Sequence, residues 1–487
     1  MRSTPESVTE KAVGAVKWSA LMEAVSRVVS PIVIVILARL LAPEDFGVVA
    51  AATIVIGFSQ MFWDAGLGKA LVQTEEPPEK AAHVVFWTNL ILGILIYVTL
   101  LLASSWLADL FHTPTSGLVL QVLGFQIVIG SLTSVQQALF ERDLGFRQLF
   151  WVKSAAAFVP GFFSIPLAFF GYGVWALVAG SLAGSLLNLA LLWGKSTWRP
   201  RMCYDWHIAR KLMGFGVWVV GESFGVWFLI WGDNLLVGKF LGVEDLGVYR
   251  VGWTISTTIF GLLLSPFLPV LYPSFSRLQE ERPLLKSAFG RVNRVVIMLA
   301  LPMGVGLLLL GPELASALFG DKWHGLGMIL GVIGFMHGMS WLVGVNPQLY
   351  RAIGRPDVNT KLMFASIIYY LPAYLLAAPR GLEAFTFTRL GVALVTIPLH
   401  IYLCVRMLHV SPLYLWHQGK YMVLATIVMA LAVSGIKQVL ALSGSSGLVV
   451  LAVLIAVGIT TYGGTLWLLD RPFVIQTKGL IKRAVLA

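Results

Sequence analysis

The chain has 487 residues, of which 57% are hydrophobic and 12% are charged, and its mean hydropathy is +0.82. This composition excludes an ordinary soluble globular protein and indicates a membrane protein made of long apolar segments. The net charge of +11 does not indicate nucleic-acid binding, because the basic residues gather in the loops on one predicted side of the membrane. The two cysteines, Cys203 and Cys404, provide neither a disulfide framework nor a metal-ligand cluster.

Long apolar runs predict an all-α integral membrane protein with fourteen transmembrane helices. Each run has roughly the 17–25 residues that a helix needs to cross the hydrocarbon of a bilayer. Helices are favoured over strands because the runs are long and do not alternate with polar residues. The first run continues to Leu41 and is too long for the core of a signal peptide, so we expect no cleaved leader. The predicted spans are 13–40, 46–65, 82–106, 117–138, 151–170, 172–193, 213–238, 247–270, 292–310, 326–348, 362–378, 384–405, 420–440 and 447–468.

The distribution of lysine and arginine predicts the orientation of the chain in the membrane. With a cytoplasmic N-terminus, most of the 35 basic residues lie in inward segments, whereas the outward loops hold only Lys322 and Arg380. This asymmetry predicts that both termini are cytoplasmic and that the number of spans is even. The inward segment Lys195–Lys211 is rich in arginine, tryptophan and tyrosine. It is either a segment lying at the headgroup level or a solvated basic linker.

One turn occurs twice and predicts an internal duplication. The stretch Ala38–Val48 reads A-R-L-L-A-P-E-D-F-G-V, and Gly238–Val248, 200 positions later, reads G-K-F-L-G-V-E-D-L-G-V. Arg39 thereby recurs as Lys239. Two six-helix bundles of parallel topology follow from this repeat, because six crossings return the chain to its starting side. The predicted domains are residues 1–205 (first bundle and cytoplasmic linker), 206–408 (second bundle) and 409–487 (two additional spans and a cytoplasmic tail).

A weaker echo supports the same duplication. The stretch from Leu139 to Arg147, after the fourth span, is similar to the stretch from Leu349 to Arg355, after the tenth.

Ionisable residues inside the first span are the first candidates for function, because each costs about 2.5–3.5 kcal/mol at mid-helix on insertion scales. Glu23 and Arg27 are four positions apart and share one helical face. They form either an internal ion pair that neutralises both charges, or a binding site in which Arg27 faces a central cavity and Glu23 orients it.

The seventh span carries Glu222 and Asp233, which are three turns apart on a similar face. Asp233 lies deep in the span, with no basic residue within one turn. It is a candidate for pairing with Arg27 or for a proton or sodium site, and Glu222 is the second candidate for ion coupling.

Further basic side chains are candidates for binding an anionic substrate. Arg39 and Lys239 are expected near the outer ends of their spans, where they either snorkel to headgroups or form a basic rim around the outer mouth. Arg250 begins the eighth span, and Arg389 lies in the twelfth. The remaining candidates are His337, more typical of a packing residue, Asp64 near the cytoplasmic face, and Lys69 and Lys153, which we expect to anchor phospholipid.

The sequence shows no arrangement typical of an enzyme. The sequence shows no nucleophile beside a base, no His/Asp/Glu cluster at metal spacing and no pair of catalytic acids. A membrane-embedded polymerase, ligase or acyltransferase is therefore disfavoured, and no cofactor is expected beyond possible coupling to H⁺ or Na⁺.

Four stretches resemble the polysaccharide-transporter family, the Wzx-type oligosaccharide flippases of the multidrug/oligosaccharidyl-lipid/polysaccharide (MOP) exporter superfamily. They are Ala38–Val48, Asp64–Gln73 (D-A-G-L-G-K-A-L-V-Q), Gln137–Phe146 (Q-A-L-F-E-R-D-L-G-F) and Tyr350–Asp357 (Y-R-A-I-G-R-P-D). The branch of the family that they resemble is that of the colanic-acid and teichuronic-acid exporters. The sugar is not identified by these motifs.

The resemblance implies two six-helix bundles around a central cavity, usually with two additional C-terminal helices. It implies a transporter of the bacterial cytoplasmic membrane that flips an undecaprenyl-diphosphate-linked oligosaccharide to the outer leaflet by alternating access. A cationic cavity would receive the diphosphate, with Arg27 as the first match to that role and Arg250 as the second. The polymerase and glycosyltransferases of the pathway are candidate partners. A drug or organic-cation antiporter of the same superfamily is the alternative.

The repeated turn also predicts a gate. Both copies, Ala38–Val48 and Gly238–Val248, are expected on the outer face, one in each bundle. Their acidic pairs, Glu44–Asp45 and Glu244–Asp245, suggest salt bridges across the outer mouth with the nearby basic residues. The simpler interpretation is that both turns only connect helices.

Overall fold

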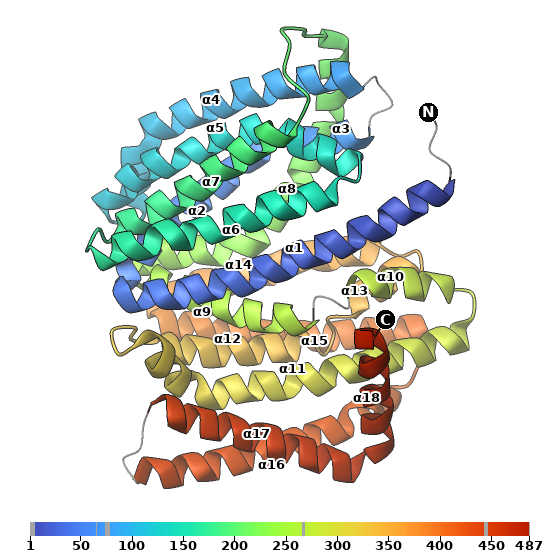
Figure 1. Ribbon diagram of the computed structural model, residues 1–487. Coiled ribbons are helices and arrows are strands. Elements are labelled where there is room, and N and C mark those ends of the chain that lie inside the picture. Colours follow the sequence, from blue (N-terminus) through green and yellow to red (C-terminus); the bar gives the residue numbers. More distant parts are fainter. Residues whose placement is uncertain (1–4, 65, 74–77, 265–267, 443–446, 487) are drawn as a thin grey trace. The chain divides into compact units, whose positions relative to one another are not determined.

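The computed structural model describes residues 5–64, 66–73, 78–264, 268–442 and 447–486, and within these ranges the chain consists of helices and short turns (Figure 1). It divides into two compact units, Met1–Arg250 and Val251–Ala487. The boundary between the units falls inside one helix, α9. It therefore differs from the boundary between the repeats, which was predicted at residue 205. The domain ranges based on the repeat stay a prediction. The helices up to that boundary are α1 (Pro5–Leu40), α2 (Pro43–Asp64), α3 (Leu67–Gln73), α4 (Pro78–Leu110), α5 (Pro114–Arg142), α6 (Phe146–Phe169), α7 (Val174–Lys195), α8 (Trp206–Leu241) and α9 (Val243–Leu264).

The second unit continues with helices of more varied length. They are α10 (Leu268–Arg277), α11 (Arg282–Phe319), α12 (Leu326–Ser340), α13 (Asn346–Ala352), α14 (Asp357–Ala377), the 3₁₀ turn η2 (Ala378–Arg380), α15 (Leu382–Leu408), α16 (Pro412–Leu442), α17 (Leu448–Leu469) and α18 (Arg471–Leu486).

Twelve helices in the described ranges are long and apolar enough to cross a membrane, which confirms an all-α integral membrane fold. The predicted span 326–348 is shorter than expected, because α12 ends at Ser340 and α13 begins only at Asn346. Pro347 lies at the start of α13, where its missing N–H is tolerated, whereas the same residue would interrupt a continuous helix. The span predicted at 247–270 corresponds to α9, which has the length but also carries Glu244, Asp245 and Arg250.

Small residues allow the helices of the first unit to pack closely. The helices pair as α4 with α5 and α6 with α7, while α1 packs on α6 and α2 packs on α5, α7 and α8. A Cβ added at Gly180 of α7 would lie 1.9 Å from the Ser164 Oγ and 2.6 Å from the Pro160 carbonyl oxygen of α6. Only glycine permits this approach, as expected where dispersion rather than water exclusion drives helix association.

Glycine performs the same role in the second unit. A Cβ at Gly338 of α12 would lie 2.7 Å from the Gly304 Cα of α11, and one at Gly311 would lie 2.3 Å from the Gly327 carbonyl oxygen. α15 packs against both α12 and α14, and α16 and α17 pack on α11. The two additional C-terminal helices are therefore docked on α11 rather than separate from the unit.

The weaker sequence echo corresponds to the same backbone turn in both units. After α5, the N–H groups of residues 143, 144 and 145 donate to the carbonyls of 139, 141 and 140 at 3.0, 3.2 and 2.7 Å. The N–H groups of residues 353, 354 and 355 donate to the carbonyls of 349, 351 and 350 at 3.0, 3.1 and 2.8 Å. Leu144 and Gly354, which occupy equivalent positions, both have positive φ, +56° and +75°. This equivalence supports the predicted duplication at the level of backbone geometry.

The basic linker after α7 is held along α4. The Trp87 indole Nε1 donates to the Arg201 carbonyl at 2.9 Å, and the Arg201 N–H donates to His83 Nδ1 at 3.1 Å. The Trp198 ring stacks on His83 with centroids 5.3 Å apart. The linker backbone is thus tied to the protein, while Trp206 remains 67% exposed and free to contact headgroups.

Candidate functional site

Glu23 and Arg27 form an ion pair along one face of α1. The Glu23 Oε1 lies 2.7 Å from Arg27 Nη2 and accepts a hydrogen bond from Nε at 2.8 Å. The Arg27 side chain is 31% exposed and that of Glu23 is 57% exposed. The pairing expected from the four-residue spacing is therefore present, and Arg27 keeps an accessible side with which it can contact a ligand. It pairs with Glu23 and not with Asp233, so the suggested Arg27–Asp233 pair is not formed.

Asp233 is buried in the α8–α9 hairpin and is held by neutral hydrogen-bond donors. Asp233 is only 4% exposed. Its Oδ2 accepts a hydrogen bond from the Tyr249 hydroxyl of α9 at 2.7 Å. Its Oδ1 accepts from the backbone N–H of Asn234 at 2.7 Å and from the Asn234 side-chain amide at 2.8 Å. These bonds fulfil the requirement that a buried carboxylate be hydrogen-bonded. Tyr249 is the residue that sequence reasoning missed, because it lies sixteen positions away on the next helix.

Arg250 follows Tyr249 in α9 and stacks on an aromatic ring. Its guanidinium carbon lies 4.1 Å from the ring centroid of Trp231 on α8. Within the described ranges it forms no ion pair with a carboxylate, although it is partly buried. A partly buried cation on a tryptophan face gains from the cation–π interaction but keeps its charge available for an anion.

The same tryptophan belongs to an aromatic cluster between α2 and α8. A Cβ added at Gly57 of α2 would lie 3.5 Å from the indole nitrogen of Trp227 and 3.6 Å from that of Trp231. Phe58 of α2 meets Trp227 edge to face, with centroids 5.0 Å apart. The two tryptophans therefore lie in van der Waals reach of α2 at Gly57, and Trp231 holds Arg250 beside this helix contact.

The two repeated turns touch each other. A Cβ at Gly47 would lie 1.6 Å from the Val243 carbonyl oxygen, and a Cβ at Gly247 would lie 1.9 Å from the Pro43 carbonyl oxygen. The contacts are reciprocal, since residues 43 and 47 correspond to 243 and 247 in the repeat. Backbone contact at both positions requires glycine. The two turns are thus in direct backbone contact in this structure, and the gate stays a prediction.

Arg39 and Lys239 lie near this contact along the chain, at the ends of α1 and α8, and both are exposed. The Lys239 Nζ lies 5.7 Å from the ring centroid of Phe240. The Asp45 carboxylate accepts a hydrogen bond from the backbone N–H of Ala42 at 2.9 Å, and so stabilises its own turn. Both predicted roles of the two basic residues, snorkelling or a basic rim, remain predictions.

In the second unit, Arg389 and His337 share one aromatic neighbour. Arg389 is 7% exposed, and its guanidinium carbon lies 3.9 Å from the Trp253 ring centroid. The His337 ring centroid lies 4.8 Å from that of Trp253 and 5.8 Å from that of Phe260. The structure brings the two predicted residues together, but in a buried aromatic cluster, as is typical of packing residues.

Lys153 lies inside the first unit, beside a polar cavity of about 360 Å³ between α5, α6 and α7. Its Nζ donates to the Gln137 Oε1 at 2.9 Å, and Gln137 in turn donates to Glu141 at 2.8 Å. Gln126 donates to the Ser181 hydroxyl across the cavity at 2.7 Å. Lys153 is therefore engaged in an internal network in this structure, whereas phospholipid anchoring was the expectation.

Among the other candidates, Lys69 is exposed and Asp64 ends α2. Glu222 lies in α8, but its side chain is outside the described part of the structure. The described residues include no group of three or more His, Cys, Asp or Glu placed to hold a metal ion.

A family model described as polysaccharide biosynthesis protein matches residues 36–327, more than half of the chain. The chain belongs to this family. The matched range includes both repeated turns, Asp233 in α8 and Arg250 in α9.

Several curated relatives agree with the family assignment. This chain is 26% identical to the succinoglycan biosynthesis transport protein ExoT of Rhizobium meliloti over 66% of each chain. It is 22% identical to the lipopolysaccharide biosynthesis protein WzxC of Escherichia coli over 75% of each chain. It is also 22% identical to the teichuronic acid biosynthesis protein TuaB of Bacillus subtilis, over 72% of this chain and 73% of TuaB. The aligned segment thus spans about two thirds to three quarters of these relatives.

Solved structures establish the fold. The lipid II flippase MurJ matches with a TM-score of 0.76 and 12% identity, over 94% of this chain and 100% of the MurJ chain. A multidrug resistance MATE family transporter of the MOP superfamily matches with a TM-score of 0.58 and 13% identity, over 80% of this chain and 95% of that chain. The chain thus has the fold of these transporters, and its apolar helices make it a multi-pass membrane protein.

Proposed function

We propose that this protein flips an undecaprenyl-diphosphate-linked oligosaccharide from the cytoplasmic to the outer leaflet by alternating access. The family assignment supports a role in polysaccharide synthesis. ExoT is named a succinoglycan biosynthesis transport protein and MurJ a lipid II flippase, and both names support a transport role. The protein would act in the bacterial cytoplasmic membrane with both termini in the cytoplasm, and would work beside the polymerase and glycosyltransferases of its pathway.

The observation that carries this proposal is the state of Arg250. It is a partly buried cation that no described carboxylate neutralises. A diphosphate would form charge-assisted hydrogen bonds with it, which are strengthened where water is excluded. Arg27 is the second cation for the diphosphate, because its accessible side is oriented by Glu23.

The charge balance also separates this function from its alternative. An organic-cation antiporter needs acidic groups available to its substrate. Here Glu23 is paired with Arg27, and Asp233 is occupied by Tyr249 and Asn234. The aromatic cluster of Trp227, Trp231 and Phe58 is the feature that favours the antiporter, because aromatic faces also bind organic cations.

The decisive test combines genetics with two variants. Deleting the gene should accumulate an undecaprenyl-linked oligosaccharide on the cytoplasmic leaflet, detected by lipid extraction and mass spectrometry. We expect Arg27→Ala and Arg250→Gln each to lower surface glycan by about tenfold or more, because each removes a charge-assisted contact of about 1.5–3 kcal/mol. Lys17→Ala is the matched control for α1, since Lys17 is exposed on the same helix.

Protein abundance in the membrane must be equal in all strains. Normal surface glycan in both arginine variants would contradict the diphosphate role. Unchanged lipid-linked oligosaccharide in the deletion strain, together with increased drug sensitivity, would support the antiporter instead.

A further inference from the structure

A basic cavity of about 820 Å³ lies in the second unit, apart from the residues considered above. It is open on one side and lined by the start of α11, the turn between α13 and α14, the first turns of α14 and the end of α15. All of these segments were predicted on the cytoplasmic side. The cavity lining contains five basic or titratable side chains: Arg282, Arg355, Lys361, Arg406 and His409.

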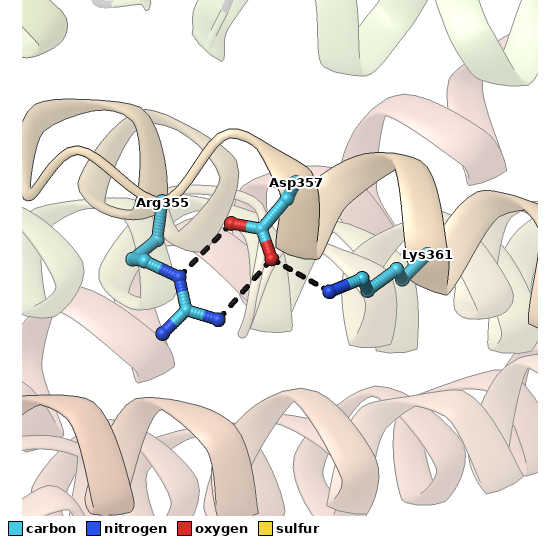
Figure 2. Close-up of polar contacts among 3 residues, drawn as sticks. All are labelled: Arg355, Asp357 and Lys361. Carbon is cyan, nitrogen blue, oxygen red and sulfur yellow. Dashed lines mark hydrogen bonds and ion pairs between the residues drawn. The ribbon is translucent and has the colours of Figure 1, made fainter.

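Two of these cations are fixed by one carboxylate. Figure 2 shows the Asp357 carboxylate between the Arg355 guanidinium and the Lys361 ammonium. Arg355 donates from Nε to Asp357 Oδ1 at 2.9 Å and from a terminal nitrogen to Oδ2 at 3.1 Å, and Lys361 donates to Oδ2 at 2.9 Å. The Arg355 and Lys361 side chains are still 54% and 76% exposed. Asp357 therefore orients both cations and neutralises only one of the two charges.

The opposite wall of the cavity is also basic. The Arg282 Nη1 lies 3.5 Å from the Met407 carbonyl oxygen, at the end of α15. Next to it, the Lys286 Nζ donates to the His409 carbonyl oxygen at 3.2 Å. The Arg406 guanidinium is directed along α15 toward the Tyr402 hydroxyl, 3.5 Å away. Arg282 and Arg406 thus contact neutral oxygens, which leaves their positive charge for a ligand.

The remaining lining is apolar and continues along the membrane-facing side of the helices. Ala365 of α14 and Leu403 of α15 line the cavity. Ile368, one turn beyond Ala365 in α14, is 75% exposed, and Val395, two turns before Leu403 in α15, is 65% exposed. A basic end joined to an apolar surface matches a phosphorylated head group joined to a hydrocarbon chain.

We propose that this cavity binds the phosphate group of a membrane lipid on the cytoplasmic side. Arg282, Arg355 and Arg406 hold the phosphate oxygens, and the chain of the lipid lies along α14 and α15. Arginine suits this task because its planar guanidinium binds phosphate through two parallel hydrogen bonds. Two sources share this chemistry, an abundant anionic phospholipid and a polyprenyl diphosphate, and either satisfies the site. The proposal concerns binding alone and does not depend on the transport function proposed above.

The test measures lipids retained by the purified full-length protein. Native mass spectrometry in detergent is performed with phosphatidylglycerol, undecaprenyl diphosphate or phosphatidylcholine. We expect both anionic lipids to be retained in preference to phosphatidylcholine. The triple variant Arg282→Gln, Arg355→Gln, Arg406→Gln should bind the anionic lipids at least about tenfold more weakly, because each basic residue at a membrane surface strengthens anionic-lipid binding severalfold.

A matched control removes the same charge elsewhere. Lys195, Arg210 and Arg277 are exposed on the predicted cytoplasmic side and do not line the cavity. Their triple glutamine variant should bind anionic lipids within about twofold of the wild-type protein, since only nonspecific attraction is lost. Equal losses in both triple variants would overturn the proposal, as would equal binding of phosphatidylcholine.

A second variant tests the apolar wall with every charge intact. Ala365→Trp places a large ring in the cavity beside Leu403. It should weaken lipid binding while retaining the elution profile of the folded protein on size-exclusion chromatography. Stronger retention of undecaprenyl diphosphate than of phosphatidylglycerol would identify the diphosphate as the preferred head group, and equal retention would identify any lipid phosphate. If inorganic pyrophosphate displaces the lipids at equal concentration, the lipid chain is not recognised and the proposal is wrong.

Discussion

At the scale of single residues, charge inside the spans is arranged in three different ways. Glu23 and Arg27 satisfy each other along one helix. Asp233 is satisfied by neutral donors of α8 and α9. Arg250 is stacked on Trp231 and paired with no described carboxylate. The cost of an ionisable group in a bilayer is thus offset by a different partner in each of these three cases, and of the three it is Arg250 that has no described counter-charge.

Asp233 is the residue at which ion coupling is predicted. Protonation would place a donor on one carboxyl oxygen, so the hydrogen bonds from Tyr249 and Asn234 would have to rearrange. We expect Asp233→Asn to slow transport by about tenfold, within the range of ordinary coupling energies. The variant should also remove the response to a pH or sodium gradient, measured with purified protein in liposomes that contain a fluorescent lipid-linked glycan.

Tyr249→Phe provides the matched comparison, because it keeps the carboxylate and removes one donor at 2.7 Å. It should retain the response to the gradient and lower stability by about 1–3 kcal/mol, the cost of an unsatisfied buried group. Transport by the wild-type protein that ignores both gradients would count against coupling at Asp233.

At the scale of helices and turns, close backbone approach is the recurring feature. Gly180, Gly304 and Gly338 bring helices together within each unit, and Gly47 and Gly247 bring the two repeated turns together. The helix pairs are packing contacts along the length of two helices. The paired turns are different, because each is a tip between two helices and has a partner of the same sequence.

The predicted outer gate depends on this contact between the turns. Glu44→Cys and Glu244→Cys, both at exposed positions, should form a cross-link in a background where Cys203 and Cys404 are replaced. Substrate and conformation-trapping ligands should change the yield of the cross-link. A yield that never changes would reduce the turns to simple connectors.

Alanine at the two glycines tests the same gate without a cross-linker. Gly47→Ala with Gly247→Ala places each Cβ within 2 Å of a carbonyl oxygen, so the turns must separate. We expect greater labelling of the cysteines at positions 44 and 244 by an impermeant thiol reagent, by about fivefold or more, because a strained contact of several kcal/mol shifts the two-state population. Gly221→Ala in α8 is the control, since a Cβ there meets nothing within 4 Å.

At the scale of the whole molecule, the second unit has helices that lie outside the predicted repeat. The second unit carries α16 and α17, which α11 holds through polar contacts. Lys437 lies 2.7 Å from Glu313, and the Tyr462 hydroxyl donates to the Met298 carbonyl at 2.8 Å. Arg294 pairs with Asp470 and stacks on Phe473. These contacts join the additional helices to the unit rather than leaving them as a loose appendage.

Arg294 is the position at which this docking can be tested. Arg294→Gln leaves Asp470, which is 8% exposed, without its cation. Removing one partner of a buried pair costs about 3–5 kcal/mol, so we expect a clear fall in the thermal unfolding temperature of the detergent-purified protein. Arg291→Gln, at an exposed position one turn earlier in α11, should leave the temperature nearly unchanged. An equal fall in both variants would show that the Arg294–Asp470 pair has no special role.

The sequence by itself determined the features that depend on local composition. Hydropathy predicted the all-helical membrane fold. It also showed that Glu23 and Arg27 are charged residues inside an apolar span, and their pairing follows from helical spacing alone. The repeated turn Ala38–Val48 and the weaker echo at Leu139 indicated the duplication, because similar sequences adopt similar local turns. The break after Ser340 had a signal in Gly344 and Pro347, which the long apolar run obscured.

The tertiary structure decided the features that depend on helix rotation and on distant parts of the chain. Tyr249 meets Asp233 only because α8 and α9 pack at one particular rotation. The basic cavity joins Arg282, Arg355 and Arg406 from three segments, whereas charge counting predicts only that they share a side of the membrane. Hydropathy is a property of each helix alone, but partners are set by packing between helices, and one sequence read in isolation does not contain that geometry.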